Sequence, residues 1–192
     1  MSATSAPFGL RAIYHPSGTV RPEAGENFLA SGYANNIFSG QPVKLLDTGL
    51  ISEVTADTDE FVGTFAGVTY TPTGGRPTLS DFWPAAATTQ TGAPITVYYT
   101  SDPWIEYEIQ TDGTVAQSGS VGSGTKFTNL TAGSTLTGLS QCTATATLVE
   151  SGTAQLRITN ISPYPDNAWG DAYVILQVMI GLSQFAGNKA VL

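Results

Sequence analysis

The chain has 192 residues, of which 41% are hydrophobic and only 11% are charged, with 15 acids against 7 Lys and Arg. This apolar content supports a sizeable core and excludes an intrinsically disordered chain. The net charge of −8 argues against DNA or RNA binding, which needs clustered basic residues to neutralise phosphates. An acid excess keeps a protein soluble or suits a partner with basic patches, and both interpretations stay open.

Residues 1–30 are predicted to form an extended arm. Prolines and glycines recur there and interrupt any helix or long strand. Apolar residues recur as well, which a disordered tail does not need. An arm lying along a neighbouring subunit explains both observations, as does an arm folded back on its own domain. In the first case the anchors are Phe8, Leu10, Ile13 and Tyr14.

The two ends of the chain carry no membrane signal. The N-terminus lacks the basic start and apolar run of a signal peptide. The most apolar stretch, residues 172–182, is too short to span a bilayer. We therefore expect a soluble protein that is made in the cytoplasm and has no membrane partner.

Short strands separated by turn residues are predicted from residue 31 onward. Residues 42–46 and 50–54 flank the turn residues 47–49 and form a predicted hairpin. Residues 60–70 are predicted as a strand, in which Gly63 and Gly67 indicate bulges or bends.

The middle of the chain continues this pattern. Residues 81–88 are predicted to make one short turn or helix. Residues 95–100 form a strand by their β-propensity. Residues 105–110 alternate apolar with polar side chains, which is typical of a half-buried strand.

The last third of the chain combines a Gly/Ser/Thr-rich segment with three strands. Residues 118–141 are predicted to be a long surface excursion. Residues 143–149 and 154–161 form a second predicted hairpin, and residues 173–180, apolar on both faces, a central strand. The predicted fold is therefore all-β, a sandwich or barrel. Its body spans residues 31–192, with a possible seam within residues 111–141.

Few residues offer chemistry. Cys142 is the single cysteine, so no intrachain disulfide forms, and its strand context predicts a buried thiol. His15 is the single histidine, and any Ser-His-Asp triad has to use it on a Pro-flanked platform. One Cys and one His are too few for a zinc site. The acids of residues 57–60 have oxygen ligands that suit calcium, but the segment lacks the glycine and the terminal glutamate of an EF-hand loop. We therefore interpret them as acids of a turn.

Glu106 and Glu108 are the best candidate catalytic pair. They lie two apart on one strand face, as a glycosidase pair requires. Their alternation with Ile and Tyr is also typical of a solvated face, which is the interpretation we favour. Trp83, Trp104 and Trp169 each lie beside a turn residue. They either cap a core or present aromatic surface to a sugar or protein.

Several segments resemble one known family taken together. They are APFGLRAIYHPSG at 6–18, SGQPVK at 39–44 followed by FAGV at 65–68, YTSDP at 99–103 with EYEIQ at 106–110, LRIT at 156–159, and PDNAWGD at 165–171. In this order they resemble the capsid decoration, or cement, proteins of tailed bacteriophages. The resemblance implies a β-tulip-like body with an N-terminal arm that binds the outside of an icosahedral shell, commonly as a homotrimer.

From this resemblance we expect a non-enzymatic structural protein of the virion exterior, made in a bacterial host. Its partners are then the major capsid protein and its own copies, and it needs no cofactor or metal. Two alternatives stay open: a carbohydrate-binding β-sandwich that uses surface tryptophans, and a structural component of a tail or fibre base. A glycosidase that uses Glu106 and Glu108 is a third.

Overall fold

The computed structural model describes residues 4–149 and 152–186, and within them every regular element is a β-strand. The first three residues of the predicted arm and the end of the predicted body lie outside this part of the chain. All pairings between the named strands are antiparallel. The all-β prediction is confirmed. The described residues hold no helix that could cross a membrane.

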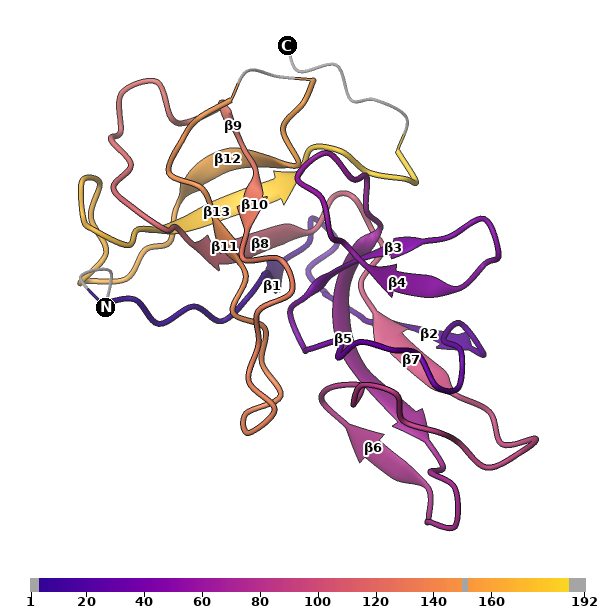
Figure 1. Cartoon of the computed structure of the whole chain (residues 1–192). Coiled ribbons are helices and arrows are strands. Elements are labelled where there is room, and N and C mark those ends of the chain that lie inside the picture. Colours follow the sequence, from indigo (N-terminus) through magenta and orange to yellow (C-terminus); the bar gives the residue numbers. More distant parts are fainter. Residues whose placement is uncertain (1–3, 150–151, 187–192) are drawn as a thin grey trace.

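Two sheets make up most of the molecule, and they form two lobes (Figure 1). The first lobe contains a five-stranded sheet in the order β1 (Arg11–Tyr14), β8 (Glu106–Gln110), β13 (Ile175–Ile180), β12 (Leu156–Ile161) and β9 (Gly124–Thr125). The small pair β10 (Phe127–Thr128) and β11 (Thr143–Ala144) belongs to the same lobe. The second lobe contains β2 (Glu23–Glu26), β7 (Thr96–Tyr99), β5 (Gly63–Tyr70), β3 (Pro42–Leu45) and β4 (Ile51–Glu53), with β6 (Thr78–Ser80) also paired to β5.

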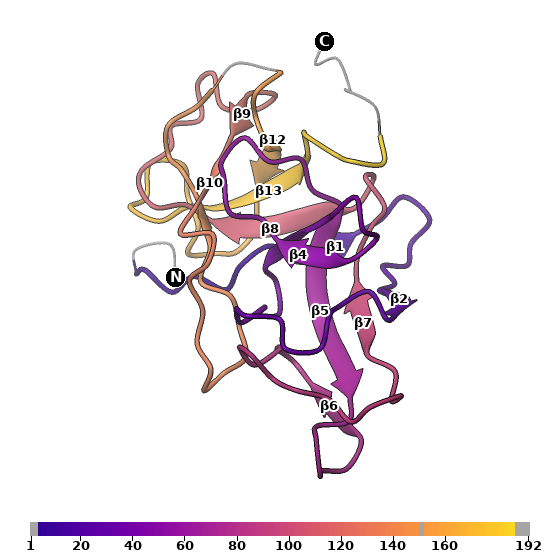
Figure 2. The same cartoon turned by 45° about the vertical axis from the view of Figure 1, so that its right-hand side comes forward.

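Each sheet covers its own hydrophobic core. The first core gathers inward side chains of β8, β12 and β13 around the fully buried Tyr107. The second core surrounds the fully buried Trp83. The chain passes from the first core to the second between β1 and β2 and returns between β7 and β8. The segment between β4 and β5 adds Val54 and Phe61 to the first core. The expected seam lay elsewhere, within residues 111–141. Figure 2 shows the two lobes from a second direction.

The predicted first hairpin is confirmed as β3 and β4, closed by a turn in which Gly49 has φ 77°. The bend predicted in residues 60–70 is confirmed as well. A register shift between Phe65 and Gly67 interrupts the β5–β7 ladder, and Gly67 has φ 140°. Only glycine adopts this conformation without strain. Gly63 has a different reason, because a Cβ there would collide with the backbone oxygen of Thr100.

The predicted central strand is also confirmed. Strand β13 lies between β8 and β12, with its inward side chains fully buried. Its outward face is only partly buried, although burial on both faces was expected: Ile175 is buried, whereas Gln177 and Met179 are half-buried. Residues 81–88 contain one short turn, as predicted, in which the Ala87 amide donates to the carbonyl of Pro84 at 3.1 Å, and they contain no helix.

The second predicted hairpin is wrong. Strand β11 pairs with β10, and β12 pairs with β13 and β9. The predicted surface excursion therefore contributes strands and the buried Phe127 to the first core. The close packing of β9 against the residues before β12 requires glycine at position 124, because a Cβ there would collide with Ala154. Propensity identifies strands but does not choose their partners.

Candidate binding surface

The N-terminal segment is folded onto its own body. Strand β1 pairs with β8 and β2 pairs with β7, so the segment forms an edge of both sheets. Of the two conformations that the sequence left open, the structure has the folded-back arm. The described part of residues 1–30 is therefore an edge segment of the protein's own two sheets.

The four expected anchors lie in different environments. Leu10 is fully buried in the first core, and its amide donates to the carbonyl of Gly40 at 2.8 Å. Phe8 and Ile13 are half-buried, and Tyr14 is 53% exposed. Leu10 thus contacts its own chain, which leaves Phe8, Ile13 and Tyr14 as the residues with surface available to a partner.

The outward face of the first sheet carries a row of polar side chains. In an antiparallel ladder, directly opposed residues lie on the same face. The register opposes Arg11 to Glu108 and Tyr14 to Glu106. It further opposes Gln177 to Glu108 and Met179 to Glu106. Arg157 is opposed to Met179. One row across four strands is therefore made of Tyr14, Glu106, Met179 and Arg157, and we call it the Glu106 row.

Glu108 is engaged in a compact cluster beside this row. Its carboxylate accepts from the Arg11 guanidinium at 2.6 Å and from the Tyr164 hydroxyl at 3.0 Å. The Arg11 guanidinium lies 4.6 Å from the centre of the Phe8 ring. Burial and the neighbouring Glu108 carboxylate raise the pKa of the Tyr164 hydroxyl. The cluster joins β1 to β8, so the role that the contacts of Glu108 support is structural.

The favoured solvated-face interpretation of Glu106 and Glu108 is wrong for Glu108. Its side chain is 5% exposed because Arg11 and Tyr164 cover it. Glu106 is half-buried and accepts a hydrogen bond from the Thr159 hydroxyl. The two carboxylates lie on one face, as the spacing predicts. Each, however, accepts hydrogen bonds from a neighbouring strand or loop.

His15 lies in a chain of hydrogen bonds that the sequence did not indicate. Its Nε2 is 3.0 Å from the Asp102 carboxylate, and its Nδ1 is 2.6 Å from the Ser17 hydroxyl. The Ser17 amide also donates to Nδ1 at 3.1 Å. The Asp102 side chain is 44% exposed. These contacts tie the loop after β1 to the turn before β8.

Two of the three acids in residues 57–60 are held by lysines. Asp59 accepts from Lys44 at 2.7 Å, and Asp57 accepts from Lys126 at 2.9 Å. Burial alone would raise the pKa of Asp59. Hydrogen bonds from Lys44 and from the amides of Ala56 and Thr55 more than offset burial, and the pKa is lowered. In the described residues, no group of three or more His, Cys, Asp or Glu side chains could hold a metal ion.

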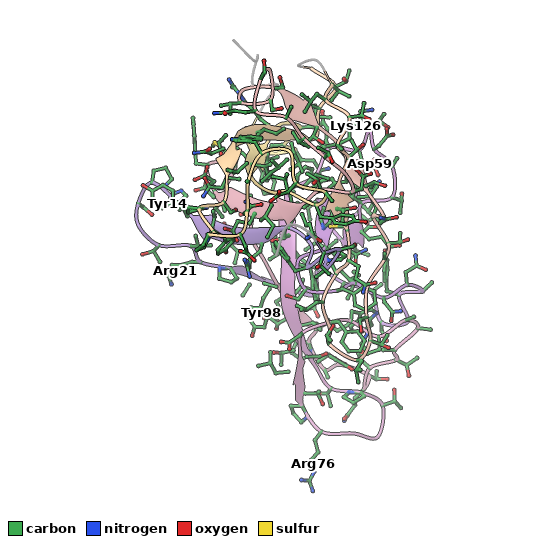
Figure 3. The ribbon with its side chains drawn as sticks, turned by 90° about the vertical axis from the view of Figure 1, so that its left-hand side faces the viewer. Tyr14, Arg21, Asp59, Arg76, Tyr98 and Lys126 are labelled. Carbon is green, nitrogen blue, oxygen red and sulfur yellow. The ribbon has the colours of Figure 1, made fainter. Side chains whose placement is uncertain are left out.

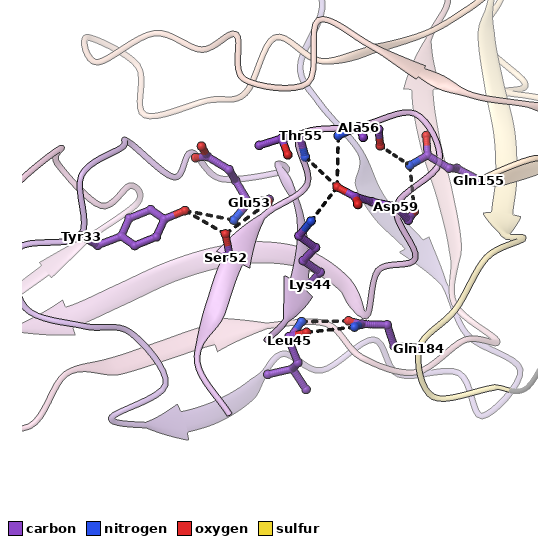
Figure 4. A network of polar contacts seen from close by, with 10 residues as sticks. All are labelled: Tyr33, Lys44, Leu45, Ser52, Glu53, Thr55, Ala56, Asp59, Gln155 and Gln184. Carbon is purple, nitrogen blue, oxygen red and sulfur yellow. Dashed lines mark hydrogen bonds and ion pairs between the residues drawn. The ribbon is translucent and has the colours of Figure 1, made fainter. Parts of the chain in front are cut away.

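The same segment connects the two lobes (Figure 4). The buried Gln155 donates to the carbonyls of Ala56 and Asp59 at 3.1 and 3.0 Å. Gln184 exchanges two hydrogen bonds with the backbone of Leu45, at 2.8 and 2.9 Å. Because these side chains come from the first lobe and their partners from the second-lobe part of the chain, they restrain the lobes against each other.

The remaining candidates divide between core and surface. Cys142 is buried as predicted, and burial raises the pKa of its thiol to about 11. Trp83 is fully buried and Trp169 is half-buried against the first core. Trp104 is 57% exposed. Of the three tryptophans only Trp104 is therefore exposed, and it comes two residues before Glu106.

Sequence reasoning missed Arg11 and Arg157 as members of this surface. The signal was present in the strand pattern. Arg157 stands between Leu156 and Ile158, which point to the core, so its side chain must point outward. The opposition of these arginines to Glu108 and Met179 depends on strand order, which the pattern does not contain.

Comparison with known proteins adds no relative: no family model, no curated protein and no solved structure matches this chain.

Proposed function

We propose that this protein is a non-enzymatic structural component of a phage virion, which binds the outer surface of the capsid and stabilises contacts between capsomers. Its partners in this role are the major capsid protein and its own copies in a homotrimer. The observation that carries the proposal is that Glu108 and His15, two of the candidate catalytic residues, make structural contacts. Glu108 and His15 hold the N-terminal segment to β8 and to the turn before it. The family resemblance of the sequence supports the same role.

The physical basis of such a role is linkage. A protein that binds the assembled shell but not the separated subunits stabilises the shell by mass action. Trimerisation multiplies weak contacts and raises the avidity by about 10²-fold or more. Adhesion of this kind needs exposed surface and a rigid body.

The contact surface in this proposal is the side of the molecule along which the N-terminal segment runs. In Figure 3, Tyr14, Arg21 and Tyr98 lie on one side, and Arg76 lies at the far end of the second lobe. Tyr14 and Arg21 are exposed, and both residue types are enriched where protein interfaces gain most of their binding energy. The surface spans both lobes, so a partner that docks there contacts both edges formed by the segment.

A binding experiment with undecorated heads tests the proposal. Deletion of residues 1–30 is unsuitable, because it removes the buried Leu10 and two paired strands. We expect the affinity of the double variant Tyr14→Ala/Arg21→Ala for heads to fall by at least about tenfold. The matched control is Phe185→Ala/Arg76→Ala, which removes an exposed aromatic and an exposed arginine elsewhere.

Bound copies per head, counted as a function of protein concentration, give the result. Equal binding by both double variants contradicts the proposed contact surface. Failure of the unsubstituted protein to bind heads contradicts the capsid role, and binding to isolated tails in that case supports the tail or fibre-base alternative.

A further inference from the structure

The Glu106 row has a composition that the capsid role does not require. It consists of Tyr14, Glu106, Met179 and Arg157, one from each of four adjacent strands. Neighbouring strands are about 4.8 Å apart, so the row spans roughly 14 Å. Tyr14 is exposed and the other three side chains are half-buried. This arrangement is a shallow polar strip with an aromatic side chain at one end.

The charges of the row balance and are kept apart. Met179 lies between Glu106 and Arg157 in the register. Neither Glu106 nor Arg157 forms an ion pair with another residue in the described part of the chain. One oxygen of Glu106 accepts from Thr159, which leaves its second oxygen available. The strip therefore offers a planar acceptor and a planar donor on either side of an apolar floor.

These features select a class of ligand. A strip with one positive and one negative group has no net attraction for an anion or a cation. Hydroxyl groups both donate and accept hydrogen bonds, so they satisfy a carboxylate and a guanidinium together. The C–H face of a sugar ring packs on exposed aromatic side chains, and Tyr14, which is 53% exposed, provides one at the end of the row.

We propose that the Glu106 row is a binding site for a neutral saccharide chain. Glu106 accepts from one sugar hydroxyl, Arg157 donates to another, and Gln177 in the adjacent row supplies an amide with both functions. Met179 and Tyr14 contact the apolar ring faces. No bond is made or broken, because the site only holds the sugar. This inference does not rest on the capsid role, since the isolated protein is expected to show it.

The test uses the purified full chain and a panel of soluble neutral probes: cello-, chito-, manno- and malto-hexaose. We expect at least one probe to shift backbone amide NMR signals of β8, β12 and β13, with signals of β6 unchanged. Arg157→Ala and Tyr14→Ala are each expected to weaken the binding of that probe about tenfold.

Arg76→Ala and Leu79→Ala are the matched controls, because both residues lie on the second lobe away from the row. Each control should bind the probe with unchanged affinity, and thermal melts should show all four variants folded. Absence of binding by the whole panel at 20 mM probe (roughly the weakest affinity of interest) overturns the proposal.

Two further outcomes also overturn it. One is binding that Arg157→Ala and Tyr14→Ala leave unchanged. The other is tighter binding of a sulfated oligosaccharide than of every neutral probe. Arg157 lies on β12, away from the N-terminal segment, so Arg157→Ala separates loss of sugar binding from loss of capsid binding.

Discussion

Each sheet has an outward row across four strands, and the two rows differ in chemistry. In the first lobe the row is Tyr14, Glu106, Met179 and Arg157, and the Arg11–Glu108–Tyr164 cluster adjoins it. In the second lobe the corresponding row is Glu26, Thr96, Thr69 and Leu79.

The second row carries one charge at its edge and two threonines at its centre. Threonine suits a pleated surface that faces water and contributes no strong contact. The architecture of the two lobes is similar, so the difference lies in the residues that the outward strand positions carry. The proposed saccharide site therefore lies on the first lobe alone, and the outward row of the second lobe supplies residues for matched controls.

The largest expected effects come from the two cores, and they test whether the lobes are one folding unit. We expect Trp83→Ala to lower the free energy of unfolding by about 3–5 kcal/mol and Leu10→Ala by about 2–5 kcal/mol, because both side chains are fully buried. Val54 and Phe61, from the second-lobe part of the chain, pack in the first core. Both variants should therefore shift one common transition in urea, followed by circular dichroism. Two separate transitions would show that the lobes fold independently.

The next effect concerns the connection between the lobes. Gln155 is fully buried and also accepts from the Phe127 amide at 3.2 Å. Gln155→Leu removes all three hydrogen bonds and leaves buried partners unsatisfied. We expect a loss of about 2–3 kcal/mol. Hydrogen exchange should increase in residues 56–59 more than in β13. Equal exchange in both segments would contradict the connecting role.

Arg11 tests whether the cluster on the first lobe is structural. Arg11→Ala leaves the buried Glu108 carboxylate with Tyr164 alone. Because the Arg11 side chain is 53% exposed, solvent screens the pair, and we expect a loss of about 1–2 kcal/mol. The double variant Arg11→Ala/Glu108→Gln should recover part of this loss in a double-mutant cycle. Full additivity of the two substitutions would exclude the coupling.

The smallest effect concerns Glu53 in the second lobe and depends on pH. Burial raises the pKa of Glu53 above 4.5, and its Oε2 has no hydrogen-bond partner, whereas Asn35 donates to Oε1 at 2.7 Å. The protonated form is therefore favoured by folding. Its contribution to stability is complete below the unfolded pKa and is lost as the pH rises through the folded pKa.

Glu53→Gln removes the charge and keeps an acceptor for Asn35. We expect this variant to be more stable than the natural chain at pH 7, by about 1 kcal/mol. The difference should shrink as the pH falls from 7 towards 4.5 in thermal melts, because Glu53 becomes protonated in the folded state before it does in the unfolded chain. A constant difference across this pH range would show that ionisation of Glu53 is not its cause. Leu79→Ala, on an exposed side chain, serves as the control with no pH dependence expected.

Alternation and turn chemistry were enough to predict the local elements. The hairpin at residues 42–54 needed only its turn residues. The strand at 106–110 needed only its period of two, although its polar side chains Glu108 and Gln110 are buried and not solvated as expected. The central strand at 175–180 followed from an apolar run. The thiol of Cys142 was placed in the interior from its neighbours alone. Each of these signals is carried by residues adjacent in the chain, where backbone geometry acts directly.

Composition and strand periodicity thus determined the all-β class, the sparse chemistry and most strand positions. The tertiary structure decided which strands meet: β12 with β13 and β9, and the N-terminal segment with β8 and β7. It also decided that Glu108 is buried and that Arg157 shares a row with Glu106. The physical reason is that partner choice depends on packing between distant segments, such as Ala154 against Gly124 and Leu10 within the first core.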